Sequence, residues 1–358
     1  MEIDVLIIGQ GICGTFLSWY LKNAGLSYLI IDEARPMSSS RIAAGLINPL
    51  TGRRLVKTWM IDELIPFVLA EYKSIGNELG INCISEKTII DFFPSPQMRL
   101  AFLKRLEDDS SFLTIPRDEN KWNAQFHYDF GFGIIEPCLL IDLHSLLSSF
   151  RKRLIADGNL VEDRFFLTEL NTEKEGIVYK NIFAKHIIFC EGIEGFTNPY
   201  FMDLPFAPNK GEALIVEIPA LPNGYIFKKG LSIVPWHEGL FWVGSSYEWN
   251  FENDNPTKVF RNKAESALTE WLKSPIKIVD HLAAIRPAVL ERRPFVGLHP
   301  IFHNIGILNG MGTKACSLAP YFAKQLASHL SAKTVIMPEV DVRRFRSLLT
   351  RSSNRFNG

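Results

Sequence analysis

The sequence lacks the features that would assign it to a specialised class of protein. Its cysteines are few and dispersed: Cys13, Cys83, Cys138, Cys190 and Cys316. An odd number of scattered cysteines argues against a disulfide framework or a zinc site, and favours a reducing compartment. We therefore expect a cytoplasmic protein that binds no metal.

Charge excess and long apolar runs are also missing. The 39 lysines and arginines balance 39 aspartates and glutamates, so the composition gives no indication of a nucleic-acid partner. The first apolar run ends at Gly9, too early for a signal peptide or a membrane span. The segment 341–358 carries five arginines, and we interpret it as a solvated terminal segment. A chain of 358 residues suits two intertwined domains.

What the sequence does contain is a strand-turn-helix-strand pattern at its start. Ile3–Ile8 is apolar and β-branched, which predicts a buried strand, and Ile12–Asn23 predicts a helix. Tyr28–Asp32 predicts a second strand. This arrangement is typical of a dinucleotide-binding unit.

The turn in that unit carries three glycines with distinct expected roles. Gly9 permits the tight turn, Gly11 lets a pyrophosphate approach the backbone, and Gly14 lets the helix lie close to the strand. The free N–H groups of the helix N-terminus attract phosphates. Asp32, 18 residues after Gly14, can accept hydrogen bonds from ribose hydroxyls. These residues predict a dinucleotide site without choosing between NAD and FAD.

The rest of the chain predicts an α/β protein with a second sheet. Helices are expected at Met60–Leu79, Leu139–Ile155 and about Thr313–His329. Strand-like runs separated by turn residues predict a mostly antiparallel sheet; they are Glu212–Ile218, Tyr225–Phe227, Leu231–Val234 and Leu240–Val243. Further strands are expected at Lys185–Cys190 and Ile305–Leu308.

Six further motifs follow one another in a recognisable order. They are Ser38–Pro49, the Asn209-Lys210-Gly211-Glu212 turn, Val234-Pro235 with Val243-Gly244-Ser245, Ile285-Arg286-Pro287, Arg293–Gly297 and Asn309–Thr313. Together with the glycine turn this set resembles the D-amino-acid oxidase family of flavoproteins, in particular its glycine oxidase and sarcosine oxidase branch.

The resemblance implies a Rossmann-like FAD-binding domain and a substrate domain built on the antiparallel sheet. We expect the FAD-binding domain to comprise residues 1–82, 136–200 and 283–358, and the substrate domain residues 83–135 and 201–282. The cofactor would be FAD, held without a covalent bond because no cysteine matches the attachment position. Its expected contacts are Gly9, Gly11, Gly14, Asp32, Glu33, Ser39, Ser40, Ala44, Gly45, Leu46, Gly192, Gly310, Met311, Gly312 and Thr313.

The same resemblance implies that two residues, Arg286 and Tyr247, lie at the substrate site. Arg286 matches the arginine that holds the substrate carboxylate, a role for which a guanidinium fork is suited. Tyr247 matches a side chain that lines the pocket. Arg292 and Arg293 are nearby competitors, which the family pattern makes turn residues. His299 and His303 do not form a metal site, because Pro300 prevents a shared helical face.

The implied reaction is oxidation of a small amine or amino acid at the carbon next to nitrogen. A hydride would pass to flavin N5, and oxygen would reoxidise the flavin. Three alternatives stay open: a dehydrogenase that passes electrons to a quinone or carrier protein, an oxidoreductase that modifies the wobble uridine of tRNA, and a flavin-binding protein without catalysis. The basic tail with Arg53, Arg54 and Lys57 would favour the tRNA enzyme, although we expect no nucleic-acid partner.

Ser232 carries an expectation about substrate size. In the glycine oxidase branch a tyrosine stands two residues before the Val-Pro pair and closes the pocket, and Ser232 occupies that place here. Serine leaves space, and unfilled volume forfeits contacts with a small ligand. We therefore expect a substrate bulkier than glycine or sarcosine, unless Trp236, Trp249 or a loop fills the gap from another direction.

Overall fold

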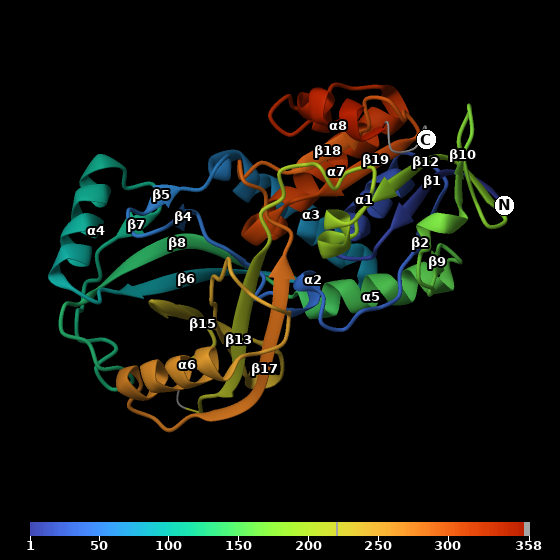
Figure 1. Ribbon diagram of the computed structural model, residues 1–358. Helices are drawn as coiled ribbons and strands as arrows, with labels where there is room; N and C mark the ends of the chain where they lie inside the picture. The colour runs from blue at the N-terminus through green and yellow to red at the C-terminus, as the bar shows by residue number, and fades with distance from the viewer. Residues whose placement is uncertain (220, 354–358) are drawn as a thin grey trace.

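The computed structural model describes residues 1–219 and 221–353, and two large sheets organise them (Figure 1). The first has eight strands, ordered β10-β11-β12-β1-β2-β9, with β19 beside β12 and β18 beside β19. Their bounds are β1 Glu2–Ile8, β2 Tyr28–Ile31, β9 Leu160–Val161, β10 Leu170–Thr172, β11 Ile177–Tyr179, β12 Ile182–Phe189, β18 Phe295–Leu298 and β19 Ile305–Asn309.

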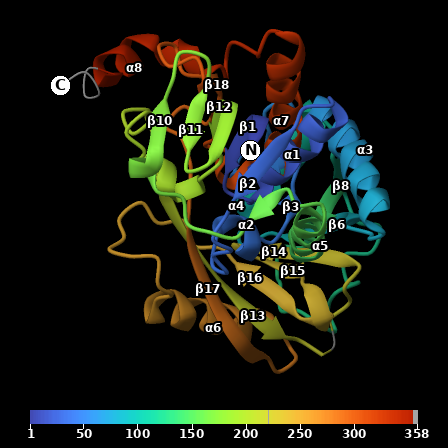
Figure 2. The same ribbon diagram turned by 90° about the vertical axis from the view of Figure 1, so that its right-hand side faces the viewer.

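The centre of this first sheet is parallel. Strands β2, β1, β12 and β19 all run in the same direction, and their side chains are almost fully buried. Strands buried on both faces read as continuous apolar runs, which is why Ile3–Ile8 could be recognised in the sequence. Figure 2 shows α1 (Ile12–Asn23), α7 (Ala315–Ala332) and α3 (Ile61–Leu79) on one side of this sheet.

The second sheet has nine strands, ordered β17-β13-β16-β15-β14-β6-β8-β3, with β7 beside β8. Every pairing in it is antiparallel except that of β14 with β6. The mostly antiparallel sheet expected from the sequence is therefore present. Its strands are β3 Leu46–Ile47, β6 Ile84–Phe92, β7 Leu113–Thr114, β8 Phe132–Ile141, β13 Asn209–Glu217, β14 Tyr225–Lys229, β15 Leu231–Pro235, β16 Phe241–Gly244 and β17 Lys277–Arg286.

The remaining elements flank the two sheets. Strands β4 (Leu50–Thr51) and β5 (Val56–Lys57) form a short hairpin. The other α-helices are α2 Ser39–Ile42, α4 Pro96–Asp108, α5 Leu143–Ala156, α6 Lys258–Trp271 and α8 Arg346–Ser353. Within the described residues, no helix combines the length and apolar character that crossing a membrane requires.

The expected helix over Leu139–Ile155 is wrong in its first turn. Residues up to Ile141 belong to β8, and α5 begins at Leu143. The side chain of Asp142 accepts a hydrogen bond from the backbone N–H of Ser145 (2.9 Å), which makes it the N-cap. The apolar residues on both sides of Asp142 belong to a buried strand and to a helix face, so apolar periodicity alone did not separate them.

The basic tail packs against the molecule. Arg343 pairs with Asp341 (2.6 Å), and Arg344 pairs with Glu291 (3.6 Å) while donating to three backbone carbonyls. Arg355 lies outside the described residues.

We propose that the two sheets are the centres of the two domains expected from the sequence. Strands β8 and β17 each contain residues that the expectation divided between the two domains.

Candidate active site

The glycine turn joins β1 to α1 with contacts that only glycine allows. Gly9 has a positive φ of 101°, and a Cβ on Gly14 would stand 1.9 Å from the carbonyl oxygen of Gly9. A side chain at Gly14 would therefore push α1 away from β1. Gly11 faces open space apart from the flexible side chain of Ser40, so the backbone at the start of α1 is accessible from the cavity beside it.

Asp32 follows β2 directly and is held by three donors. The backbone N–H groups of Gln10 (2.8 Å) and Ala34 (2.9 Å) and the guanidinium of Arg151 (2.6 Å) all donate to its carboxylate. A carboxylate offers about four acceptor positions, so Asp32 keeps acceptor capacity for a hydroxyl of a ligand. Arg151 comes from α5 and also pairs with Glu162 (2.8 Å).

A long cavity runs from Asp32 to the second sheet. It consists of one chamber of about 490 Å³ beside Gly9, Asp32 and Glu33, and another of about 480 Å³ over the sheet. The two chambers share six lining residues, which are Gly11, Ser39, Ser40, Cys190, Gly192 and Ala284. The site is therefore an elongated channel that passes the N-terminus of α1.

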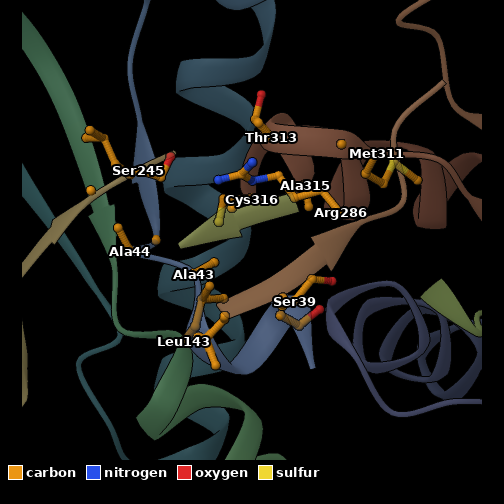
Figure 3. Close-up of a pocket in the computed structure, with 18 of the residues that line it drawn as sticks. Ser39, Ala43, Ala44, Leu143, Ser245, Arg286, Met311, Thr313, Ala315 and Cys316 are labelled. Atoms are coloured by element: carbon orange, nitrogen blue, oxygen red, sulfur yellow. The ribbon is translucent and has the colours of Figure 1, made fainter. Parts of the chain in front are cut away.

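Two segments form opposite walls of the sheet-side chamber (Figure 3). One wall is the segment 39–46, from which Ser39, Ser40, Ala44, Gly45 and Leu46 line the cavity. Ser40 also accepts a hydrogen bond from the N–H of Ile12 (3.2 Å), which ties this wall to α1.

The other wall is the turn that precedes α7. Met311, Gly312 and Thr313 line the cavity, whereas Gly310 lies behind them against Val289. Asn309 donates to the carbonyl oxygen of Gly192 (2.8 Å) and so joins this wall to the end of β12.

Arg286, at the end of β17, lies over the floor of the cavity. Its guanidinium donates to the side-chain oxygen of Asn209 (2.6 Å) and to the carbonyl oxygen of Ser246 (3.3 Å), and it covers Gly211 so closely that a Cβ there would lie 1.8 Å from Nη2. No carboxylate among the described residues forms an ion pair with it. Burial lowers the pKa of Arg286 from its ordinary value. A partly buried cation facing a cavity without a carboxylate is suited to bind an anionic ligand.

The structure does not place Tyr247 in the cavity lining. Its ring lies beside the Arg286 guanidinium (5.6 Å to the ring centre) and stacks edge-on with Trp249, and both rings are more than half exposed. Ser245, two residues earlier, lines the cavity instead.

Several side chains in the channel escaped the sequence reasoning. Arg151 and Glu191 stand at the Asp32 end, and Trp242 and Lys228 stand on the floor. Arg151 and Lys228 lie far along the chain from the residues that they contact, so no local spacing could have identified them, whereas Trp242 and Glu191 directly precede Val243-Gly244-Ser245 and Gly192 and could have been found from those motifs. Among the described residues, no cluster of His, Cys, Asp and Glu has the arrangement of a metal site.

The residues present fit an elongated dinucleotide. The channel has an exposed helix N-terminus for phosphates, a carboxylate at the end of β2 for a ribose, and a chamber walled by small residues at the other end. Asp32 and the glycine turn would hold the nucleotide half, and the segments 39–46 and 311–313 would flank the ring.

Comparison with known families agrees with this geometry. The family model described as FAD dependent oxidoreductase (DAO) matches residues 4–329. The chain therefore belongs to this family of enzymes, whose members bind FAD, which confirms the resemblance noted in the sequence.

Solved structures with a similar fold include an oxidase of glycine, an oxidase of iminodiacetate and a dehydrogenase of L-proline. Glycine oxidase from Bacillus cereus has a TM-score of 0.77 at 15% identity, covering 94% of this chain and 99% of its own. Iminodiacetate oxidase from Chelativorans sp. BNC1 has a TM-score of 0.73 at 18% identity, covering 94% and 97%. L-proline dehydrogenase from P. horikoshii has a TM-score of 0.73 at 15% identity, covering 97% and 98%.

Proposed function

We propose that this protein binds FAD without a covalent bond and oxidises a small amine or amino acid at the carbon next to its nitrogen. The observation that carries the proposal is Arg286, a partly buried cation that faces the cavity and has no carboxylate partner among the described residues. The names of the similar structures support the substrate class, because glycine, iminodiacetate and proline are all amines that carry a carboxylate.

The chain itself would bind and orient the substrate. Arg286 would hold the carboxylate as a fork, with Asn209 fixing the guanidinium. On the floor, the Arg286 guanidinium covers Gly211 and the Trp242 ring covers Gly244, and the small side chain of Ala213 would let the substrate lie close to the sheet between them. When bound, FAD supplies hydride acceptance at N5, and its reoxidation by oxygen would complete the cycle.

The cofactor part of the proposal is tested by direct release. The purified protein should be yellow and should release FAD on acid precipitation. A colourless protein that cannot be reconstituted with FAD, or one that releases only NAD, contradicts it.

The substrate part is tested by anaerobic mixing with a panel of amines and amino acids while the flavin absorbance is followed. Bleaching by a carboxylated amine, and none by its decarboxylated analogue, is the expected result, because only the former can pair with Arg286. Bound FAD that no amine reduces would instead favour a flavin-binding protein without catalysis. Reduction by amines followed by slow reoxidation in air would favour a dehydrogenase.

A further inference from the structure

The indole ring of Trp242 covers the middle of the cavity floor. Trp242 lies on β16 and lines the cavity, and its ring stands over Gly244, where a Cβ would lie 2.7 Å from Cη2 of the indole. The whole residue is only 9% exposed. The absence of a side chain at position 244 makes room for the ring, so an aromatic surface borders the cavity at this place.

The ring is held from two sides. Its N–H donates to the carbonyl oxygen of Ile42 (3.0 Å) at the end of α2, and on the sheet Trp242 lies opposite Val234 of β15. Ile42 and Val234 line the cavity as well, so the surroundings of the ring are apolar. Because Ile42 already uses the N–H, the indole offers a ligand only its carbon atoms. A ring fixed in this way loses little freedom when a ligand packs on it.

The indole and the guanidinium of Arg286 stand on either side of Ala213. The guanidinium covers Gly211, and the indole covers Gly244, which lies directly opposite Ala213. Gly211 and Gly244 are therefore diagonal neighbours on β13 and β16, about 7–8 Å apart. A carboxylate oxygen stands about 2.8 Å from a guanidinium nitrogen, and an apolar atom about 3.5–4.0 Å from a ring carbon. A carboxylate and the carbon next to it thus fit between the two groups.

The charges of the other lining residues are already paired. Apart from Arg286, the charged residues of the described lining are Glu212 and Lys228. Glu212 pairs with Lys210 (3.7 Å), and Lys228 pairs with Asp91 (2.9 Å). A second charged group on a ligand would find no unpaired partner near the indole, whereas an apolar group would find a matching surface.

We propose that Trp242 determines specificity by binding an uncharged, apolar substituent of the substrate. The carboxylate pairs with Arg286, the carbon that is oxidised lies over Ala213, and the substituent packs on the indole and extends toward Ser232. The substrate class is therefore an amino acid with an apolar substituent, for which an aromatic ring is best suited because it stacks on indole. This inference rests on the proposed function, because it assumes that the same cavity receives the substrate.

The test uses three carboxylates that lack an amine, so that it measures binding and not turnover. Acetate, phenylacetate and succinate are titrated into the FAD-loaded protein by calorimetry at constant ionic strength. Phenylacetate should bind at least tenfold more tightly than acetate, because its ring leaves water for the indole. Succinate should bind within about threefold of acetate, since its second charge has no unpaired partner. Equal affinities for acetate and phenylacetate, or tightest binding of succinate, would overturn the inference.

The two tryptophans of the β15–β16 hairpin supply a matched pair of variants. Trp242→Ala should reduce the preference for phenylacetate to less than threefold and leave the affinity for acetate unchanged, which also shows that the variant is folded. Trp242→Phe should keep most of the preference, because it retains an aromatic face. Trp236→Ala should keep all of it, because Trp236 packs on His237 (5.0 Å between ring centres) and does not line the cavity. A preference that survives Trp242→Ala would contradict the role of Trp242. If the alanine variant does not fold, the wild-type comparison of the three carboxylates still decides.

The two proposals fail in different ways. If amino acids reduce the flavin and phenylacetate binds no more tightly than acetate, the inference about Trp242 is wrong and the proposed function stands. If phenylacetate binds preferentially through Trp242 but no amine reduces the flavin, the proposed function is wrong and the apolar subsite stands.

Discussion

Two arginines occupy opposite ends of the channel and differ in how they are neutralised. Arg151, at the Asp32 end, contacts the carboxylates of Asp32 (2.6 Å) and Glu162 (2.8 Å). Arg286, at the sheet end, donates to the neutral oxygens of Asn209 and Ser246 and forms no ion pair with any described residue. The charge of Arg151 is already paired, so it can position a neighbouring acid. The charge of Arg286 has no ionic partner among the described residues, and we propose that this difference gives the two ends their roles.

The largest effect is expected from Arg286→Met. The variant should lose about 2–5 kcal/mol of carboxylate binding, the range for removing one partner of a buried charge pair, and should retain FAD. Titration of a substrate carboxylate or a monocarboxylate inhibitor measures the first effect, and the flavin content of the purified variant measures the second. Unchanged carboxylate affinity, or loss of the flavin, would indicate that Arg286 has a structural role.

Arg151→Met should produce the opposite pattern. Without the guanidinium, Asp32 loses one of its three donors, and FAD binding should weaken by about 1–3 kcal/mol while carboxylate binding by the reconstituted protein stays unchanged. Flavin fluorescence on dilution of the holoenzyme measures the FAD dissociation constant. Arg153→Met, also on α5, is the control, since Arg153 does not contact Asp32. Equal FAD affinity in both variants would contradict a positioning role.

The variant Ser232→Tyr tests whether the sheet end of the channel is wide enough for a substrate bulkier than glycine. The structure places Ser232 in the cavity lining, as the expectation about substrate size requires, while neither Trp236 nor Trp249 lines the cavity. A tyrosine should fill the part of the cavity over β15 and favour glycine over bulkier amines by about 1–2 kcal/mol in relative kcat/KM. Steady-state kinetics over a size series measures this. A wild-type enzyme that already prefers glycine or sarcosine would show that the cavity is not enlarged in the relevant place.

The two ends of the channel also differed in how far the sequence predicted them. The Asp32 end depends on one local unit, in which Gly9, Gly14 and the residue after β2 lie within 24 positions of each other, and its geometry follows from the backbone. Helix α1 was predicted with the bounds that it has. Arg151 was missed because it reaches Asp32 from 119 positions away.

The sheet end is assembled from strands that are distant in the sequence. Lys228 faces Ser232 and Asp91 only because β14 pairs with both β15 and β6, and no periodicity in the sequence specifies such pairings. Resemblance to a family suggested both Arg286, which lines the cavity, and Tyr247, whose side chain lies outside the lining. Motifs thus predicted which segments meet, and tertiary pairing determined which side chains face the cavity.

The smallest effect on ligand binding is expected at Glu191, which borders the Asp32 end of the channel and should instead change the pH dependence of stability. Burial raises the pKa of Glu191 from 4.5 to about 7, partly opposed by the hydrogen bond from Asn198. A folded-state pKa above the unfolded one means that the folded protein binds more protons, so stability is full below pH 4.5 and falls as the pH rises to about 7. Glu191→Gln lacks this loss, and it should raise the free energy of unfolding at pH 8 relative to its effect at pH 4.5, by at most about 3 kcal/mol for a pKa shift of this size. Urea unfolding of the FAD-free protein at the two pH values measures the difference, with the exposed Glu175→Gln as the control. An effect of the same size at both pH values, or in both variants, would show that Glu191 does not titrate in this range.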